Sequence, residues 1–137
     1  MIMKRMIVSC SLFLLLSAGN LYAFCFDEAG SLYNISPRIL QAIAQVESGF
    51  RPDALNRNAN GTYDYGLMQI NSSWARVFGE KLWSSLGDPC TNVKAGAWIL
   101  SDCIRRYGYT WEAVGYYNAA TKHKRVKYVK KVYQALR

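Results

Sequence analysis

Two carboxyl side chains flank a short polar segment of the sequence. Glu47 follows an apolar stretch, and Asp64 stands 17 residues later, at the head of the run Asp64-Tyr65-Gly66-Leu67-Met68-Gln69-Ile70-Asn71. Cleavage of a glycosidic bond needs a proton donor and a group that handles positive charge at the anomeric carbon, and two carboxyl groups can supply both. The pair is therefore a candidate for the cleavage of sugar polymers.

Glu47 falls on the inner side of an expected helix. The dipeptide Ser36-Pro37 is typical of an N-cap followed by the first helical residue. Leu40, Ile43 and Glu47 then recur at helical spacing on one face. Burial disfavours an ionised carboxyl group, so we expect a raised pKa for Glu47, which suits a general acid. The alternative is a helix-end glutamate turned to solvent.

The remaining sequence indicates short helices joined by turn-rich loops. We expect helices over residues 25–33, from Ser36-Pro37 to Gly49, over Ser72 to Phe78 with Asn71 as cap, from Asp88-Pro89 to Gly108, and after Thr110. In the longest one, Val93, Ala97, Leu100, Ile104 and Tyr107 share a face; in a last amphipathic helix, Val126, Val129, Tyr133 and Leu136 do so. Asn60-Gly61 is a type I′ hairpin signal, so Thr62 to Tyr65 should form one strand of a small β-hairpin or irregular lobe, with Asp64 at the edge of that lobe. These elements predict one predominantly helical α+β domain.

The first 23 residues have the pattern of a signal peptide. Lys4 and Arg5 precede an apolar run from Met6 to Leu16, and Leu21-Tyr22-Ala23 resembles a signal-peptidase site. We expect residues 1–23 to be removed and residues 24–137 to form the domain, exported to the periplasm or beyond. An uncleaved anchor is the alternative, but the run is shorter than the roughly 20 apolar residues of a spanning helix. We therefore expect no stable membrane insertion.

The expected mature chain is basic. Without Lys4 and Arg5 it has 15 basic and 9 acidic residues, a net charge of +6, which favours a polyanionic partner. Export argues against nucleic acid and favours anionic polymers of the cell envelope or an acidic protein. A basic end is formed by Lys122, His123, Lys124, Arg125, Lys127, Lys130 and Lys131. It is either a solvated helix face or a surface for such a partner. We expect no metal or cofactor, because there is no CxxC motif and the single histidine lies in this stretch, and we expect a monomer.

Three cysteines remain in the expected mature chain, in a compartment that permits disulfides. They are Cys25, Cys90 and Cys103, so one pair and one leftover thiol is the simplest outcome. Cys103 lies inside a helical pattern with hydrophobic neighbours, which indicates a buried thiol. Our first choice is therefore a bridge between Cys25 and Cys90, with a typical effect on stability of ~2–4 kcal/mol.

Three ordered motifs carry a resemblance to a known family. Glu47-Ser48, the run from Gly66 to Asn71, and Tyr117-Asn118-Ala119 occur in the order and at the spacing of the lysozyme-like lytic transglycosylases. These relatives of goose-type lysozyme cleave peptidoglycan between N-acetylmuramic acid and N-acetylglucosamine. The resemblance covers the whole expected mature chain and is closest to the small exported enzymes that accompany type III and type IV secretion systems. Members of that group also have a cysteine after the signal peptide and another in Asp-Pro-Cys, which supports the bridge between Cys25 and Cys90.

The resemblance implies a lysozyme-like fold and a role for each matching residue. Glu47 would protonate the glycosidic oxygen and then act as a base, while the C6 hydroxyl of muramic acid attacks C1 and gives a 1,6-anhydro product. Ser48 would position the acid or bind sugar. The other substrate-binding residues implied are Gly66, Met68, Gln69, Asn71, Tyr117 and Asn118. Gly66 to Ile70 would wall the cleft, where the glycine lets the backbone approach the sugar closely.

Three positions depart from the pattern of that family. Asp64-Tyr65-Gly66, followed by Gln69-Ile70-Asn71-Ser72, resembles the segment of hen-type lysozymes that holds their second carboxylate, which implies a stabilising or nucleophilic role for Asp64. A turn or cap aspartate is the structural alternative. Tyr116 and Ala120 add bulk around the third motif. Three functions follow: a lytic transglycosylase, a true muramidase that uses Asp64 and water, or a non-catalytic wall-binding assembly module.

Overall fold

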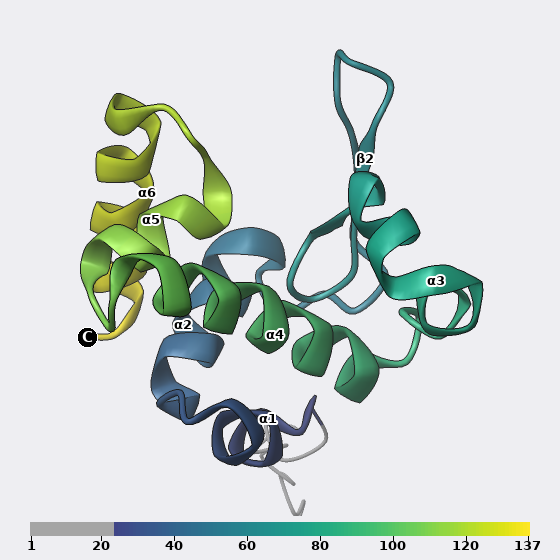
Figure 1. Ribbon diagram of the computed structural model, residues 1–137, viewed down its shortest axis with the longest axis horizontal. Helices are drawn as coiled ribbons and strands as arrows, with labels where there is room; N and C mark the ends of the chain where they lie inside the picture. The colour runs from purple at the N-terminus through teal and green to yellow at the C-terminus, as the bar shows by residue number, and fades with distance from the viewer. Residues whose placement is uncertain (1–23) are drawn as a thin grey trace, which may run out of the picture.

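The longest helix, α4 (Pro89–Tyr107), crosses the middle of the molecule, as Figure 1 shows. The computed structural model describes residues 24–137, so the expected signal peptide, residues 1–23, lies outside the described residues. The other elements are α1 (Phe26–Tyr33), α2 (Pro37–Ser48), β1 (Leu55–Arg57), β2 (Tyr63–Tyr65), β3 (Ile70–Asn71), the short 3-10 helix η2 (Ser72–Trp74), α3 (Ala75–Ser84), α5 (Trp111–Asn118) and α6 (Lys122–Ala135). The prediction of a predominantly helical α+β fold is confirmed.

The two ends of α4 support different parts of the molecule. In Figure 1, α5 and α6 lie beside its C-terminal half, whereas β2 and α3 lie beyond its N-terminal half. The helix begins as the sequence predicts, because the Asp88 side chain accepts a hydrogen bond from Thr91 N at 2.8 Å. Within residues 24–137, none of the helices is long and apolar enough to cross a membrane.

The inner face of α4 forms much of the core, with one exception at its C-terminal end. Val93, Ala97 and Leu100 are fully buried, as predicted. Tyr107 instead remains 38% exposed, and its ring stacks on Tyr116 of α5 with 3.8 Å between the ring centroids. The predicted core face of this helix is therefore too long by one turn.

The predicted hairpin forms, but with a different turn. β1, β2 and β3 make an antiparallel sheet in that order. In the connection between β1 and β2, Gly61 N donates to Asn58 O and Asn58 N donates to Thr62 O. A type I′ turn needs positive φ at both central residues. Gly61 has a φ of +85°, but Asn60 is not among the described residues with positive φ, so the type I′ prediction is wrong.

The inner face of α6 also differs from the prediction. Val126 and Tyr133 are each 48% exposed, whereas Tyr128 and Val132, one turn apart, are buried. This face packs against α2 and α5. The helix is therefore rotated relative to the predicted stripe, and Tyr128 contacts α2 through its hydrogen bond to Glu47.

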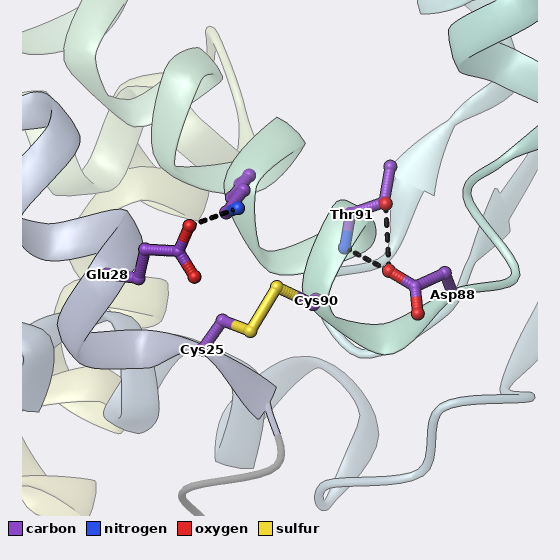
Figure 2. A network of polar contacts seen from close by, with 6 residues as sticks. Cys25, Glu28, Asp88, Cys90 and Thr91 are labelled. Atoms are coloured by element: carbon purple, nitrogen blue, oxygen red, sulfur yellow. Dashed lines mark hydrogen bonds and ion pairs between the residues drawn. A yellow bond between two sulfur atoms is a disulfide. The ribbon is translucent and has the colours of Figure 1, made fainter.

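A disulfide joins the start of α1 to the first turn of α4. It links Cys25 and Cys90 across a sequence separation of 65, as predicted (Figure 2). Glu28, next to the bridge, forms an ion pair with Lys94 at 2.6 Å. Cys25, Glu28 and Cys90 lie close together, but metals prefer thiolates to disulfide sulfurs, so we assign this cluster a structural role. Cys103 has no disulfide partner among residues 24–137 and is only half-buried, which corrects the expectation of a buried thiol.

Candidate active site

Glu47 lies in the last turn of α2, at a cleft between the helices and the small sheet. The helix ends there because Gly49 adopts the left-handed conformation, with φ of +59°, and its N–H bonds back to the helix. The cleft has a volume of about 640 Å³. Its lining is largely polar and includes Glu47, Asn58, Asp64, Gln69, Asn71, Trp74, Ile99, Tyr117, Asn118 and Lys124.

Glu47 has the electrostatic surroundings of a general acid. Burial raises its pKa from 4.5 to about 7, and the negative charge of Asp64 adds to this effect. Two groups act in the opposite direction: the Tyr128 hydroxyl donates to Oε1 at 2.6 Å, and Lys131 contributes positive charge. The predicted rise in pKa is confirmed. Near neutral pH both forms of the carboxyl group are populated, so Glu47 can give a proton and take one back.

Asp64 lies at the centre of β2, opposite Asn71 of β3. Its Oδ1 accepts a hydrogen bond from Asn71 Nδ2 at 2.7 Å, and its Oδ2 accepts one from Asn58 Nδ2 at 3.0 Å. The side chain is therefore held from two sides at the cleft. Asp64 lies within strand β2, so it is not the turn or cap aspartate that the sequence left as the structural alternative.

Tyr117 connects the third motif to the segment that follows Asp64. Its hydroxyl donates to the backbone oxygen of Met68 at 2.8 Å. Burial, with the negative charge of Glu47 as a further cause, raises the pKa of Tyr117 well above its usual range, so the phenol stays neutral at physiological pH. Asn118, the next residue, is exposed and lines the cleft.

Gln69 reaches the cleft, but its amide is used within the protein. Nε2 donates to the backbone oxygens of Ala54 and Gly66, at 3.1 and 2.9 Å. Its Oε1 accepts from Asn56 Nδ2 at 2.5 Å. These bonds tie Gln69 to β1 and to the turn before β3, so the side chain shapes the cleft wall.

Three residues expected at the sugar lie behind the cleft. Ser48 is 4% exposed and donates to Leu67 O at 2.8 Å. Gly66 has φ of +80°, and a Cβ there would lie 2.1 Å from Asn92 Nδ2. Met68 is fully buried. None of the three lines the cleft, and the group close to Gly66 is the Asn92 side chain. Ser48 is placed to position the end of α2, and the expected sugar contacts of these residues stay predictions.

Comparison with known families agrees with this arrangement. A family described as "Transglycosylase SLT domain" matches residues 24–135, which is nearly the whole described chain. The chain belongs to the transglycosylase SLT domain family. Membership indicates a lytic-transglycosylase-like function with peptidoglycan as the substrate class, and it confirms the resemblance inferred from the three motifs.

Individual known proteins are similar to this chain over most of their length. "Invasion protein IagB" of Salmonella typhimurium (strain SL1344) is 44% identical over 130 residues, which cover 90% of this chain and 81% of that protein. "Protein IpgF" of Shigella flexneri is 43% identical, over 82% of this chain and 78% of its own length. "Peptidoglycan-binding-like protein" of Escherichia coli O157:H7 is 37% identical, over 80% and 74% of the two chains.

Two residues of this SLT-family site were not predicted from the sequence. Tyr128 reaches Glu47 across 81 residues of sequence, and its only sequence signal is the spacing of four to Val132. Asn92 is buried in α4; its Oδ1 accepts from Met68 N at 2.9 Å, and its Nδ2 donates to the backbone oxygens of Tyr65 and Leu86, at 3.1 Å each. Asn92 thereby fixes the turn between Asp64 and Gln69.

Proposed function

We propose that this protein is an exported lytic transglycosylase that cleaves the β-1,4 bond between N-acetylmuramic acid and N-acetylglucosamine in peptidoglycan. The observation that supports the proposal most directly is Glu47, at a polar cleft with a pKa of about 7. A carboxyl group with this pKa can be protonated at neutral pH, as a general acid must be before the first step. Membership of the SLT family agrees with this chemistry.

The reaction begins with proton transfer from Glu47 to the glycosidic oxygen. The bond from C1 to that oxygen breaks, the N-acetylglucosamine end leaves as an alcohol, and positive charge develops at C1. The Glu47 carboxylate, stabilised by the Tyr128 hydroxyl, then takes the proton of the muramic acid C6 hydroxyl. The C6 oxygen bonds to C1, giving the 1,6-anhydro product and restoring the protonated acid.

Asp64 has a supporting role in this proposal. Its negative charge at the cleft stabilises the oxocarbenium-like transition state and also favours the protonated form of Glu47. A second candidate function, hydrolysis by a muramidase, is favoured by the same observation, because a fixed second carboxylate is what a retaining hydrolase uses. Water would then end the reaction in place of the C6 hydroxyl.

Mass spectrometry of digested sacculi separates these two reactions. The transglycosylase gives 1,6-anhydromuropeptides, whereas the muramidase gives products with reducing ends. We expect Asp64→Asn to lower the rate substantially, through loss of the negative charge near C1. A turnover close to that of the wild type would return Asp64 to a structural role.

Glu47→Gln tests the assignment of the acid and also the non-catalytic alternative. We expect this variant to lose wall lysis while it still binds sacculi, because the amide keeps the shape of the side chain but carries no transferable proton. Glu80→Gln, at an exposed position of α3, is the matched control and should keep full activity. Lysis by Glu47→Gln would refute the assignment. A wild type without lytic activity in any wall assay would favour a binding or assembly module.

The expected leader and the relatives support a proposal about the place of action. We propose removal of residues 1–23 on export and local opening of the wall for a type III or type IV secretion apparatus, since a relative named "Invasion protein IagB" is 44% identical. The exposed lysines of α6 would attract the anionic wall or an acidic component of that apparatus. N-terminal sequencing of the protein from the periplasm should start at Phe24; a start at Met1 would refute cleavage.

A further inference from the structure

The small sheet presents different chemistry on its two faces. Successive side chains of a strand point to opposite faces, and paired residues point to the same one. Asn56, Asp64 and Asn71 are in register across the three strands, and the last two line the catalytic cleft. The alternate residues Leu55, Arg57, Tyr63 and Tyr65 therefore belong to the rear face of the hairpin, away from that cleft.

These four residues and Trp83 of α3 line a second pocket, here called the rear pocket, of about 500 Å³. The lining residues come from two elements that lie beside each other, the hairpin that contains β2 and helix α3 (Figure 1). The rings of Tyr63 and Trp83 meet edge to face, with 6.1 Å between their centroids. A volume of this size is within the ~300–1,000 Å³ of ordinary ligand sites.

The charge of the rear pocket comes from one arginine. Arg57 pairs with Tyr63 across β1 and β2, is exposed, and within residues 24–137 its guanidinium takes part in no hydrogen bond or ion pair that the structure shows. No acidic side chain lines the pocket. Aromatic rings offer flat apolar surface with polar edges, and a guanidinium binds carboxylates through two parallel hydrogen bonds.

We propose that the rear pocket binds a second segment of peptidoglycan glycan, separate from the segment in the catalytic cleft. The C–H face of a sugar ring would pack on the aromatic rings, and a carboxylate of the muramyl lactyl group or of the stem peptide would pair with Arg57. This inference rests on the proposed function, which makes peptidoglycan the substrate. A polymer fits the arrangement because the wall presents many identical segments around one enzyme molecule.

The second site would hold the enzyme on the wall between cuts. When one of two linked sites is occupied, the other binds as if its ligand were at a high local concentration, so the two sites together bind more tightly than either alone. The cleft then releases its product without loss of the protein from the wall. The rear pocket would thus change residence on the wall and not the chemistry at Glu47.

The four tryptophans allow the two sites to be observed separately. Trp74 lines the cleft, Trp83 lines the rear pocket, and Trp111 lies on α5. We suggest titrating 15N-labelled Glu47→Gln protein with soluble glycan fragments and following the indole N–H signals by NMR. We expect saturable shifts of Trp74 and Trp83 and a constant Trp111 signal. Fragments with and without stem peptides distinguish a peptide carboxylate from the lactyl carboxylate.

Arg57→Gln in the same background provides the matched test. It should weaken the binding reported by Trp83 about tenfold, the typical effect of losing one charge-assisted hydrogen bond, and leave the binding reported by Trp74 unchanged. Arg76→Gln, which removes the same charge from an exposed site of α3 outside the pocket, should change neither. Shifts of Trp74 alone would overturn the rear site and leave the proposed function intact. A Trp83 signal that responds to an acidic peptide but not to glycan would also overturn it, in favour of a protein partner; absence of any shift would refute the glycan substrate as well.

Discussion

The stability of the protein should depend on pH through Glu47, and Glu47→Gln should remove that dependence. Burial raises the pKa of Glu47 from 4.5 to about 7. Each pKa unit corresponds to 1.36 kcal/mol, so the shift amounts to about 3 kcal/mol. Well below pH 4.5 the carboxyl group is protonated in both the folded and the unfolded state, so its burial does not lower the free energy of unfolding through ionisation.

The sign of the effect follows from which state holds the proton more tightly. Between pH 4.5 and about 7 the folded state keeps the Glu47 proton while the unfolded state releases it. The free energy of unfolding therefore falls as pH rises through this range and levels off above pH 7. Glutamine does not titrate, so relative to the wild type Glu47→Gln should gain about 3 kcal/mol between pH 4 and pH 8.

Urea unfolding followed by tryptophan fluorescence measures this difference. The free energy of unfolding is determined for the wild type and for Glu47→Gln at several values between pH 4 and pH 8.5, and one is subtracted from the other. A constant offset reflects the new amide and its contact with Tyr128, so the test is the change with pH. Glu80→Gln, exposed on α3, corrects for net charge. A difference that stays flat from pH 4.5 to 7, or that falls, would refute the burial argument.

Three further predictions concern the groups that position the site. Tyr128→Phe removes a hydrogen bond that favours ionised Glu47. The alkaline limb of the pH profile of wall lysis should therefore move up by about one pH unit or more. Tyr133→Phe, at an exposed position of the same helix, should leave the profile unchanged. A profile that stays unchanged in Tyr128→Phe as well would contradict the assigned role of Tyr128. Gly66→Ala adds a Cβ that clashes with the buried Asn92 of α4, so it should destabilise the fold by about 3 kcal/mol. Gly61 also has positive φ, but no atom lies within 4 Å of its Cβ position, so Gly61→Ala should destabilise the fold by only about 1 kcal/mol. Equal urea midpoints for these two variants would refute the packing argument. Reduction of the disulfide between α1 and α4 should lower the free energy of unfolding by about 2–4 kcal/mol, and an unchanged urea midpoint in reductant would contradict this.

Local signals in the sequence predicted the starts of helices well. Asn71, Asp88 and Thr110 each accept a hydrogen bond from a backbone N–H two or three residues ahead, as expected of cap residues. A cap is decided by residues within one turn of each other, so the sequence contains all the information that the interaction needs. The same holds for the end of α2 at Gly49.

Contacts between distant segments were harder to predict. Tyr128 was missed because its partner is 81 residues away, and α6 has apolar residues on more than one side. Asn92 was missed for a similar reason: its three hydrogen bonds go to backbone groups of other segments, which leave no pattern in sequence. Gly66 was expected at the sugar because a glycine in such a segment indicates that another group approaches the backbone closely. The sequence does not identify that group, which in the structure is the Asn92 side chain.

The two carboxyl groups of the cleft differ in what holds them. From residues 24–137 Glu47 accepts one hydrogen bond, at Oε1, and its other oxygen can transfer a proton to a substrate. Each oxygen of Asp64 accepts one hydrogen bond, from an amide of the hairpin turn or of β3, and keeps a further lone pair. These two bonds fix the orientation of the carboxylate and hold its negative charge at the cleft, an arrangement that either charge stabilisation or attack on C1 can use. The proposal that Asp64 acts through its charge therefore depends on the product: it requires 1,6-anhydro ends, formed by the C6 hydroxyl of muramic acid, and reducing ends from the wild type would contradict it.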